Sequence, residues 1–403
     1  MTDTDRLSRF ADLVVNVGVN VQPGQDVVLL ADLAHRDIAR AIVERAYVAG
    51  AAFVHVEWSD GPVRHSMLKH ASLERLTASR PWAVDRNTSW ADQQVALINL
   101  AGDPDPHLFD DVDPAKAAAF PIEEAMAIQV AMLSTKMRWN IVAAPNPGWA
   151  KQIFGEPDVE RLWAAVSTAM RLDEPDPVAA WRERSAELGA RAKALDALEL
   201  TEVHLRSAAT DLTVGLCANT RWTGGGGEDP AGISFMPNIP TEEVFTSPDR
   251  RRADGHITLT KPVIVNGQQV EGMKVTFAGG RITDVTADSN VDAVLAQLER
   301  EGARSLGEVA LVDRHSRIAK AGIVFHNTLF DENAGCHVAW GQSFPFTIEG
   351  GLEMSDDDRY EAGLNRAMVH TDVVVGGEGM TVTGTGPKGT VEILRDDEWV
   401  LPL

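Results

Sequence analysis

Residues 23–32 read Pro-Gly-Gln-Asp-Val-Val-Leu-Leu-Ala-Asp, a turn signal followed by a short apolar run over Asp26–Asp32. Apolar residues then recur at helical spacing across Ile38–Ala49, and Gly50 can close that helix. Phe53–Trp58 alternates in the manner of a strand. A strand, a helix and a second strand in this order predict a parallel βαβ unit at the start of the fold.

The same alternation continues through the first half of the chain. Val95–Ala101 is another apolar run, Pro121–Met137 has a helical pattern, and Trp139–Ala144 resembles a strand. Two long amphipathic helices are expected over Asp158–Leu172 and Pro177–Leu198. The pattern predicts an α/β domain with a doubly wound, mostly parallel sheet over residues 1–197.

The hydrophobic period changes near residue 199. Glu199–Leu205 and Asp211–Leu216 alternate like antiparallel strands, and short strands with Gly and Asn turns continue to the end of the chain. We therefore expect a second, strand-rich α+β domain over residues 198–403. The glycines of 223–227 lack the Lys-Ser/Thr of a phosphate-binding loop, so a mobile loop is expected there.

Composition excludes several classes of function. The chain has 37 Lys and Arg against 59 Asp and Glu, a formal net charge of −22, which argues against nucleic acid and anionic membranes as partners. Its two cysteines, Cys217 and Cys336, form neither a disulfide framework nor a cysteine zinc finger. No secretory signal and no apolar run of about 18 residues is visible. A cytoplasmic location is the expectation.

Metal-ligating residue types gather in the second half: Glu243, Glu308, His337, and His370 with Asp372. Residues i and i+2 of a strand point to one face, so His370 and Asp372 can reach one point. Two histidines with three carboxylates suit two divalent cations about 3.5–4 Å apart. By pattern alone the signal is weak, because His-x-Asp arises often by chance and a lone Glu before a strand is usually solvated.

Four longer strings give these residues a specific context. They are Pro240-Thr-Glu-Glu-Val-Phe-Thr, Leu306-Gly-Glu-Val-Ala-Leu-Val, Asn327-Thr-Leu-Phe-Asp-Glu-Asn-Ala, and His370-Thr-Asp followed by Gly376. In these strings and their order the chain resembles the aminopeptidase T / aminopeptidase S family of metallopeptidases. The N-terminal half fits less distinctively, through Val21–Gln25, and the resemblance covers essentially the full length.

The resemblance implies a homodimeric enzyme that removes N-terminal residues from peptides with a free N-terminus, using two divalent metal ions per chain (zinc, cobalt or magnesium). It implies an α/β N-terminal domain and a C-terminal domain that carries the metals. The metal ligands that it implies are Glu243, Glu308, His337, His370 and Asp372. We expect Glu308 to bridge the two ions, and we choose Glu243 over Glu242 because the family's Glu directly precedes Val-Phe.

One position departs from the family. Seven residues after the first histidine ligand, where the family has a tyrosine with a catalytic or ligating role, this chain has Phe344. The loss of a hydroxyl that stabilises an oxyanion would lower the rate by about 10²–10³. Glu242 and Glu332 are candidates for proton transfer or for recognition of the substrate amine, and His326 could line the pocket.

Two other functions remain open from the sequence. Relatives of this family include a mononuclear iron dioxygenase that opens dihydroxypyridine rings, and His337, His370 and Asp372 could form its 2-His-1-carboxylate site. A metal-binding homologue with little or no peptidase activity is the other alternative, and Phe344 is its support. The metal content separates the first alternative from the peptidase, and turnover of peptides separates the second.

Overall fold

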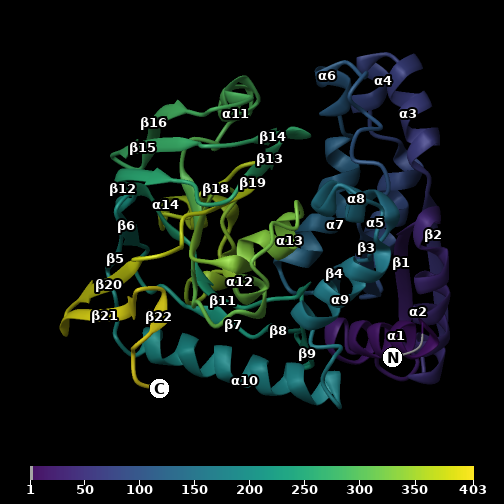
Figure 1. The fold of residues 1–403 in the computed structure, drawn as a ribbon, viewed down its shortest axis with the longest axis horizontal. Coiled ribbons are helices and arrows are strands. Elements are labelled where there is room, and N and C mark those ends of the chain that lie inside the picture. The colour runs from purple at the N-terminus through teal and green to yellow at the C-terminus, as the bar shows by residue number, and fades with distance from the viewer. Residues whose placement is uncertain (1–2) are drawn as a thin grey trace. The chain divides into compact units, whose positions relative to one another are not determined.

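The computed structural model describes residues 3–403, which divide into two compact units (Figure 1). The first unit contains Met1–Arg184 and Gly226–Pro240, and the second contains Ser185–Gly225 and Thr241–Leu403. The sequence analysis expects a single boundary after residue 197, and the two units differ from that division. The chain passes between the units inside helix α10 (Pro177–Asp196), and residues 226–240 return to the first unit.

A five-stranded, fully parallel sheet forms the centre of the first unit, in the order β10-β4-β3-β1-β2. Its strands are β1 (Asp26–Asp32), β2 (Phe53–Ser59), β3 (Ala96–Ala101), β4 (Trp139–Ala143) and β10 (Asn238–Ile239). The predicted parallel α/β sheet is confirmed. The short strand β10 lies far along the chain, in the segment that returns, and no periodicity of the sequence predicts it.

Helices cover both faces of this sheet. Val28 and Leu30 of β1 pack in a cluster with Trp90 of α5 (Pro81–Asp92) and Ala131 of α7 (Ile122–Leu133). The alternate residues, such as Val27, are buried against the other face, where α2 contacts β1. The helical segments of this unit are α1 (Asp3–Leu13), η1 (Val14–Gly18), η2 (Leu33–His35), α2 (Arg36–Val48), α3 (Gly61–His70), α4 (Leu73–Thr77), α5 (Pro81–Asp92), α6 (Pro114–Ala117), α7 (Ile122–Leu133), α8 (Pro147–Phe154) and α9 (Val159–Ala169).

Within residues 3–403, no helix combines the length and the apolar character that crossing a membrane requires.

A buried arginine fastens the returning segment to the first unit. Arg138 donates to the backbone carbonyl of Val19 at 3.0 Å and also pairs with Asp229 and Gln25. Asp229 lies in this segment beside its two short strands, β8 (Gly227–Glu228) and β9 (Ser234–Phe235). The ion pair therefore satisfies a buried guanidinium and anchors the segment, whose Phe235, Met236 and Ile239 are also buried.

Two antiparallel sheets build the second unit (Figure 1). The eight-stranded sheet has the order β16-β15-β12-β6-β5-β20-β21-β22, and the five-stranded sheet has the order β19-β18-β17-β11-β7. The strands of the larger sheet are β5 (Glu202–Arg206), β6 (Asp211–Leu216), β12 (Pro248–Thr258), β15 (Lys274–Ala278), β16 (Arg281–Thr286), β20 (Thr381–Gly386), β21 (Gly389–Arg395) and β22 (Glu398–Trp399). The strands of the smaller sheet are β7 (Thr223–Gly224), β11 (Glu243–Thr246), β17 (Leu306–Val312), β18 (His337–Gly341) and β19 (His370–Val374).

The two sheets share one apolar core. Leu205 and Val214 of the larger sheet belong to the same buried cluster as Val309 and Val338 of the smaller sheet. A two-stranded hairpin and short helices complete this unit: β13 (Val263–Val265), β14 (Gln268–Val270), α11 (Val291–Leu298), α12 (Arg317–Ala321), α13 (Thr328–Asp331), η3 (Glu332–Ala334), η4 (Pro345–Thr347) and α14 (Asp356–Glu361).

The prediction of a mobile loop over Thr223–Gly227 is wrong for its first two residues. Thr223–Gly224 forms strand β7, which pairs with β11 at the edge of the five-stranded sheet. A Cβ on Gly224 would lie 3.0 Å from the carbonyl oxygen of Leu188 and 3.1 Å from a methyl of Val244. The glycine thus allows a close approach of backbones rather than a free loop.

The side chain of Asn365 connects the turn that precedes β17 to the end of β18. Its side-chain nitrogen lies 2.7, 3.1 and 2.7 Å from the carbonyl oxygens of Gly302, Ser305 and Gly341. Its backbone N–H donates to the hydroxyl of Ser343 at 2.9 Å. Because the residue is 4% exposed, water does not replace these contacts readily.

We predict that Asn365→Ala lowers the free energy of unfolding by about 1–3 kcal/mol, because buried carbonyl groups lose their donor. Urea or guanidinium denaturation of the full chain measures the difference. Gln268→Ala, at an exposed residue of β14, is the control and is expected to change stability by less than about 0.5 kcal/mol. Equal stabilities of the two variants would contradict the prediction.

Candidate metal centre

Four adjacent strands of the five-stranded sheet carry the residues singled out as metal ligands. Glu243 begins β11, Glu308 lies in β17, His337 begins β18, and His370 and Asp372 lie in β19. The strand order β19-β18-β17-β11 makes these strands direct neighbours. The structure therefore brings together five residues that are spread over 130 positions of the sequence.

Strand alternation decides which side chains face this cluster. Val309 of β17 and Val338 of β18 lie in the apolar core. Successive residues of a strand point to opposite faces, so the preceding residues, Glu308 and His337, share the other face. One face of the sheet thus supplies the core and the other collects charged side chains.

Small residues leave room between the charged ones. Ala310 lies opposite His337, and Ala339 lies between Glu308 and Asp372 in the cross-strand register. Both alanines are fully buried. A larger side chain at either position would occupy the space in which the carboxylates and imidazoles meet.

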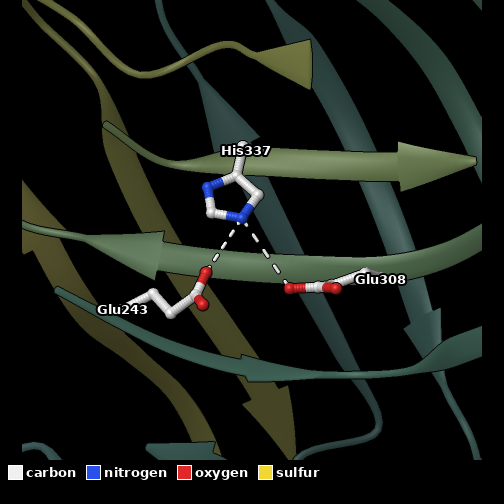
Figure 2. A group of neighbouring side chains, drawn as sticks. All are labelled: Glu243, Glu308 and His337. Atoms are coloured by element: carbon white, nitrogen blue, oxygen red, sulfur yellow. Dashed lines mark ion pairs between the residues drawn. The ribbon is translucent and has the colours of Figure 1, made fainter. Parts of the chain in front are cut away.

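Glu308 occupies the centre of the cluster. The Nε2 atom of His337 lies 3.0 Å from Glu243 Oε2 and 3.7 Å from Glu308 Oε1 (Figure 2). The Nε2 atom of His370 lies 3.1 Å from Glu308 Oε2 and 3.3 Å from Asp372 Oδ1. Ligand atoms of Glu243, Glu308 and His337 lie mutually within 4.8 Å, and so do those of Glu308, His370 and Asp372. Two triads therefore share one carboxylate.

Backbone carbonyls orient both imidazole rings. His337 Nδ1 lies 3.3 Å from the carbonyl oxygen of Gly335, and His370 Nδ1 lies 2.7 Å from that of Gln342. A carbonyl only accepts, so each Nδ1 carries the hydrogen, and a neutral ring then presents the lone pair of Nε2 to the carboxylates. Glu243 is buried, and its Oε2 atom faces His337 Nε2 at 3.0 Å. A buried carboxylate oxygen and an imidazole nitrogen that face each other in this way fit a bound cation.

A β-bulge and a glycine support this orientation. The register of β17 against β18 shifts between Leu306 and Glu308, so an extra residue, Gly307, lies beside the central carboxylate. A Cβ on Gly307 would lie 2.3 Å from the carbonyl oxygen of Gln342, the group that orients His370. Only glycine leaves that carbonyl in place.

The charges of the cluster shift one another's pKa values. Burial alone lowers the pKa of His337 and of His370, but the neighbouring carboxylates outweigh burial and raise both pKa values well above 6.5. Burial raises the pKa of Asp372, yet His370 outweighs it and the net pKa is lowered. Burial raises the pKa of Glu243. The cluster thus holds protons where a cation would otherwise balance the negative charge.

A further carboxylate, Glu332, completes the negative surroundings. It is 8% exposed, and its one hydrogen bond in the described structure is a long one, 3.4 Å, from Asn333. Burial, and then the charges of Asp372 and Glu243, raise the pKa of Glu332 well above its usual value. Glu332 lies beside the cluster, and its role in proton transfer or amine recognition stays a prediction.

Asn333 is a residue that the sequence pattern does not single out, and it holds the backbone next to Glu243 in place. Its Oδ1 atom accepts the backbone N–H of Glu242 at 2.6 Å, and its carbonyl accepts the hydroxyl of Ser316, also at 2.6 Å. Both Asn333 and Ser316 are fully buried. An Asn after a Glu has no distinctive pattern, so only the fold identifies this role.

Phe344 lies beside the second triad. Its ring centroid is 5.1 Å from that of His370, and it also contacts Phe245 and stacks on Phe346 at 5.4 Å. A hydroxyl on this ring would be carried close to the cluster. Tyr360 does not supply this hydroxyl in its place, because its ring stacks under the guanidinium of Arg250.

A small, open pocket lies beside the cluster, within the second unit. Glu332 and Asp372 form one side of it, and His326 lines it as well. Its lining residues are Pro262, Val263, Ile264, Gln269, His326, Asn327, Thr328, Asp331, Glu332, Asp372 and Val374. The pocket gives a small ligand access to the carboxylates.

The family model described as thermophilic metalloprotease (M29) matches residues 3–399. The chain belongs to this family. The predicted membership is therefore confirmed, and with it the expectation of a hydrolase that depends on a divalent metal. The donor set on the five-stranded sheet is the part of this M29 chain that fits such a metal.

Individual relatives agree with the M29 assignment. "Aminopeptidase PepS" of Streptococcus thermophilus is 38% identical over 408 residues, which cover 98% of each chain. The structure of wild-type AmpT from Thermus thermophilus matches with a TM-score of 0.91 at 32% identity, covering 99% of this chain and 100% of that one. A 2,5-dihydroxypyridine dioxygenase from Pseudomonas putida matches with a TM-score of 0.56 at 10% identity, covering 99% and 97%, which shows a likeness of fold.

We predict that metal loading of the metal-free protein releases protons near neutral pH, because His337 and His370 have raised pKa values and must lose their protons to bind metal. Metal affinity should therefore rise as the pH rises through these pKa values. In the metal-free protein the imidazolium groups stabilise the fold below about pH 6.5, and this contribution is lost as the pH rises through the folded-state pKa.

Calorimetric titration with zinc in two buffers of different ionisation enthalpy counts the released protons. His337→Gln should release fewer protons than the wild type. His204→Gln, at an imidazole paired with Asp211 on the eight-stranded sheet, is the control and should release as many as the wild type. An unchanged count in His337→Gln would contradict the prediction.

Proposed function

We propose that the protein is an aminopeptidase that uses two divalent metal ions to remove N-terminal residues from peptides with a free amino terminus. The observation that carries this proposal is the pair of ligand triads that share Glu308. One triad alone would suit one ion, whereas a shared carboxylate suits two ions in close proximity. The family and its aminopeptidase relatives support the same reading.

In this proposal, Glu243 and His337 hold one ion, His370 and Asp372 hold the other, and Glu308 bridges them. The oxygens of Glu308 face different histidines, at 3.7 and 3.1 Å, which supports the bridging role. Bound metal would lower the pKa of a water molecule toward about 7 and polarise the scissile carbonyl. The three carboxylates balance most of the charge of two divalent ions.

The donor types narrow the choice of metal. Mixed imidazole and carboxylate ligation suits zinc and cobalt, whereas magnesium prefers oxygen ligands and keeps several waters. We therefore propose zinc or cobalt before magnesium.

Recognition of a free amino terminus requires negative charge that the metal ligands do not use up. Glu332 lines the pocket, lies outside both triads and has one long hydrogen bond. We assign it the contact with the substrate's ammonium group, whose positive charge would favour the ionised carboxylate over the protonated form that its buried site otherwise favours. This attraction would explain a preference for peptides with a free amino terminus over N-acylated ones.

The homodimer and the cytoplasmic location belong to this proposal as predictions. Sedimentation of the purified protein tests the first, and fractionation of cells that express it tests the second. Neither result alters the chemistry proposed for the centre.

A ring-opening iron dioxygenase has less support. Its resemblance to this chain is one of fold, at 10% identity. A single 2-His-1-carboxylate site would use His337, His370 and Asp372 and would leave Glu243 buried without a cation. About one iron per chain, with no amide cleavage, would favour this alternative.

Glu308→Gln should lower kcat/KM for aminoacyl p-nitroanilides by at least about 100-fold, because both ions lose a charged ligand. Elemental analysis of the same sample should show fewer than the two metals per chain expected for the wild type. Glu353→Gln, at an exposed glutamate outside both triads, is the matched control. A wild-type protein that holds two metals and cleaves no substrate would refute the peptidase, and equal cleavage of N-acetylated substrates would refute the exopeptidase.

Phe344→Tyr should raise kcat by at least about tenfold with little change in KM, if the family's hydroxyl stabilises charge that develops in the transition state. Steady-state kinetics of the metal-loaded variant give both constants. Phe346→Tyr adds a hydroxyl to the neighbouring ring of the same stack and should leave kcat unchanged. An unchanged kcat in Phe344→Tyr would show that this hydroxyl has no catalytic role here.

A further inference from the structure

A polar side chain, that of Gln297, lies on the core side of the five-stranded sheet. Gln297 belongs to α11, whose Val294 and Leu298 pack in the apolar core that the two sheets share. The residue is 7% exposed, so its amide is largely removed from water. A buried amide costs free energy unless hydrogen bonds within the protein replace those to water. The hydrogen-bond partners of Gln297 therefore indicate what the residue does.

One oxygen atom of Gln297 joins the two strands that carry the histidine ligands. Its Oε1 atom accepts the indole N–H of Trp340 in β18 at 2.8 Å and the hydroxyl of Thr371 in β19 at 3.1 Å. An indole N–H only donates, so the amide atom that faces it is the oxygen. Trp340 and Thr371 lie opposite each other in the antiparallel register of the two strands. Gln297 thus holds one cross-strand pair from the core side.

Thr371 lies between the two ligands of β19. His370 precedes it and Asp372 follows it, and both point to the face opposite to that of Thr371. Rotation of the strand about its own axis would therefore move both ligands together, away from Glu308. The hydrogen bond from Thr371 to Gln297 opposes this rotation, because it fixes the strand on the side opposite to the ligands.

Strand β19 needs such support because it is the edge strand of its sheet. In the order β19-β18-β17-β11-β7, the strands that carry Glu243, Glu308 and His337 each have a strand on both sides. The side chains of Glu308 and His337 are 6% and 1% exposed, whereas that of His370 is 24% exposed. The sheet therefore fixes the triad of Glu243, Glu308 and His337 more firmly than it fixes His370 and Asp372.

We propose that Gln297 is a positioning residue for the metal ion held by His370 and Asp372, and that it sets the affinity of this ion and not that of the ion held by Glu243 and His337. The inference rests on the proposed two-metal function and goes beyond it, because it makes the two sites unequal and names the residue responsible. Hydrogen bonds behind metal ligands change metal affinity by about 10–100-fold when they are lost.

Gln297→Leu tests the inference, because leucine occupies a similar volume and leaves Trp340 and Thr371 without their acceptor. Equilibrium dialysis of the metal-free full chain against cobalt gives the number of ions bound per chain at each free cobalt concentration. The wild type should bind two ions. In the variant, half-saturation of one ion should require at least about tenfold more cobalt, and that of the other should change by less than about threefold. A merely structural defect would weaken both ions together.

Two substitutions of Thr371 separate the hydrogen bond from the packing. Thr371→Val keeps the shape of the side chain and the contact between Gln297 and Trp340, and it removes the hydroxyl alone. It should weaken the same ion at least about fivefold. Thr371→Ser keeps a hydroxyl and should stay within about threefold of the wild type. These variants keep the inference testable if Gln297→Leu does not fold.

The cobalt dependence of cleavage is an independent measurement of the same effect. Gln297→Leu should need more cobalt than the wild type for half-maximal cleavage of aminoacyl p-nitroanilides, while its kcat at saturating cobalt stays within about threefold of the wild type. A kcat that is lowered to the same extent at every cobalt concentration would contradict a positioning role.

Thr210→Val is the matched control. Thr210 is 1% exposed, and its hydroxyl accepts the backbone N–H of Thr258 at 3.2 Å, so this variant also loses a buried hydrogen bond, but in the eight-stranded sheet. It should bind both ions as the wild type does. Two ions that weaken equally, or that keep their wild-type affinities, in both Gln297→Leu and Thr371→Val would overturn the inference and leave the aminopeptidase intact. A wild type that binds a single cobalt ion would instead overturn the proposed two-metal function.

Discussion

The repulsion among buried carboxylates on one face of a five-stranded sheet is the constraint on which the second unit depends. Glu243, Glu308 and Asp372 are all largely buried, and their oxygens surround two imidazoles. Carboxylates removed from water are stable only when protons or cations balance them. The raised pKa values of both histidines show the molecule balancing them with protons, in the place where metal ions would do so more completely.

The rest of the unit holds this cluster against its own repulsion. The opposite face of the same sheet is apolar and packs against the eight-stranded sheet, so each ligand-bearing strand is fixed by a core residue next to its ligand. Backbone carbonyls fix the two rings, a bulge at Gly307 directs Glu308, and Asn365 joins the turns around them. Each of these supports acts through the backbone, which cannot relax as a long side chain can. The charged groups therefore meet at distances that a flexible surface would not maintain.

The sequence predicts local structure and ligand types better than it predicts arrangement. Apolar runs and helical spacing locate strands β1 to β4 and helices α2, α7, α9 and α10, because burial acts on neighbouring positions. The helices over 61–92 escape detection, since their apolar positions are few and several remain exposed. Strand β10 and the return of residues 226–240 depend on partners such as Arg138, far away in the chain. At the centre, the i, i+2 relation of His370 and Asp372 follows from strand geometry alone. That β11, β17, β18 and β19 are neighbours does not, and it enters only through the family resemblance or the structure.

A dioxygenase has a similar fold, so the fold does not separate the possible reactions. The set of donor side chains on the sheet is the feature that separates them. A sheet of this kind can present histidines and carboxylates to one ion or to two, and at 10% identity the shared fold carries no information about which. Glu243 makes the difference here. Its carboxylate is buried, on the strand next to Glu308 and 3.0 Å from His337 Nε2, where the proposed second ion would be held. Under the proposed two-ion reaction, Phe344 bears on the rate of the reaction rather than on its class. The ring of Phe344 lies beside His370, and the residues proposed as metal ligands all meet on one face of the sheet.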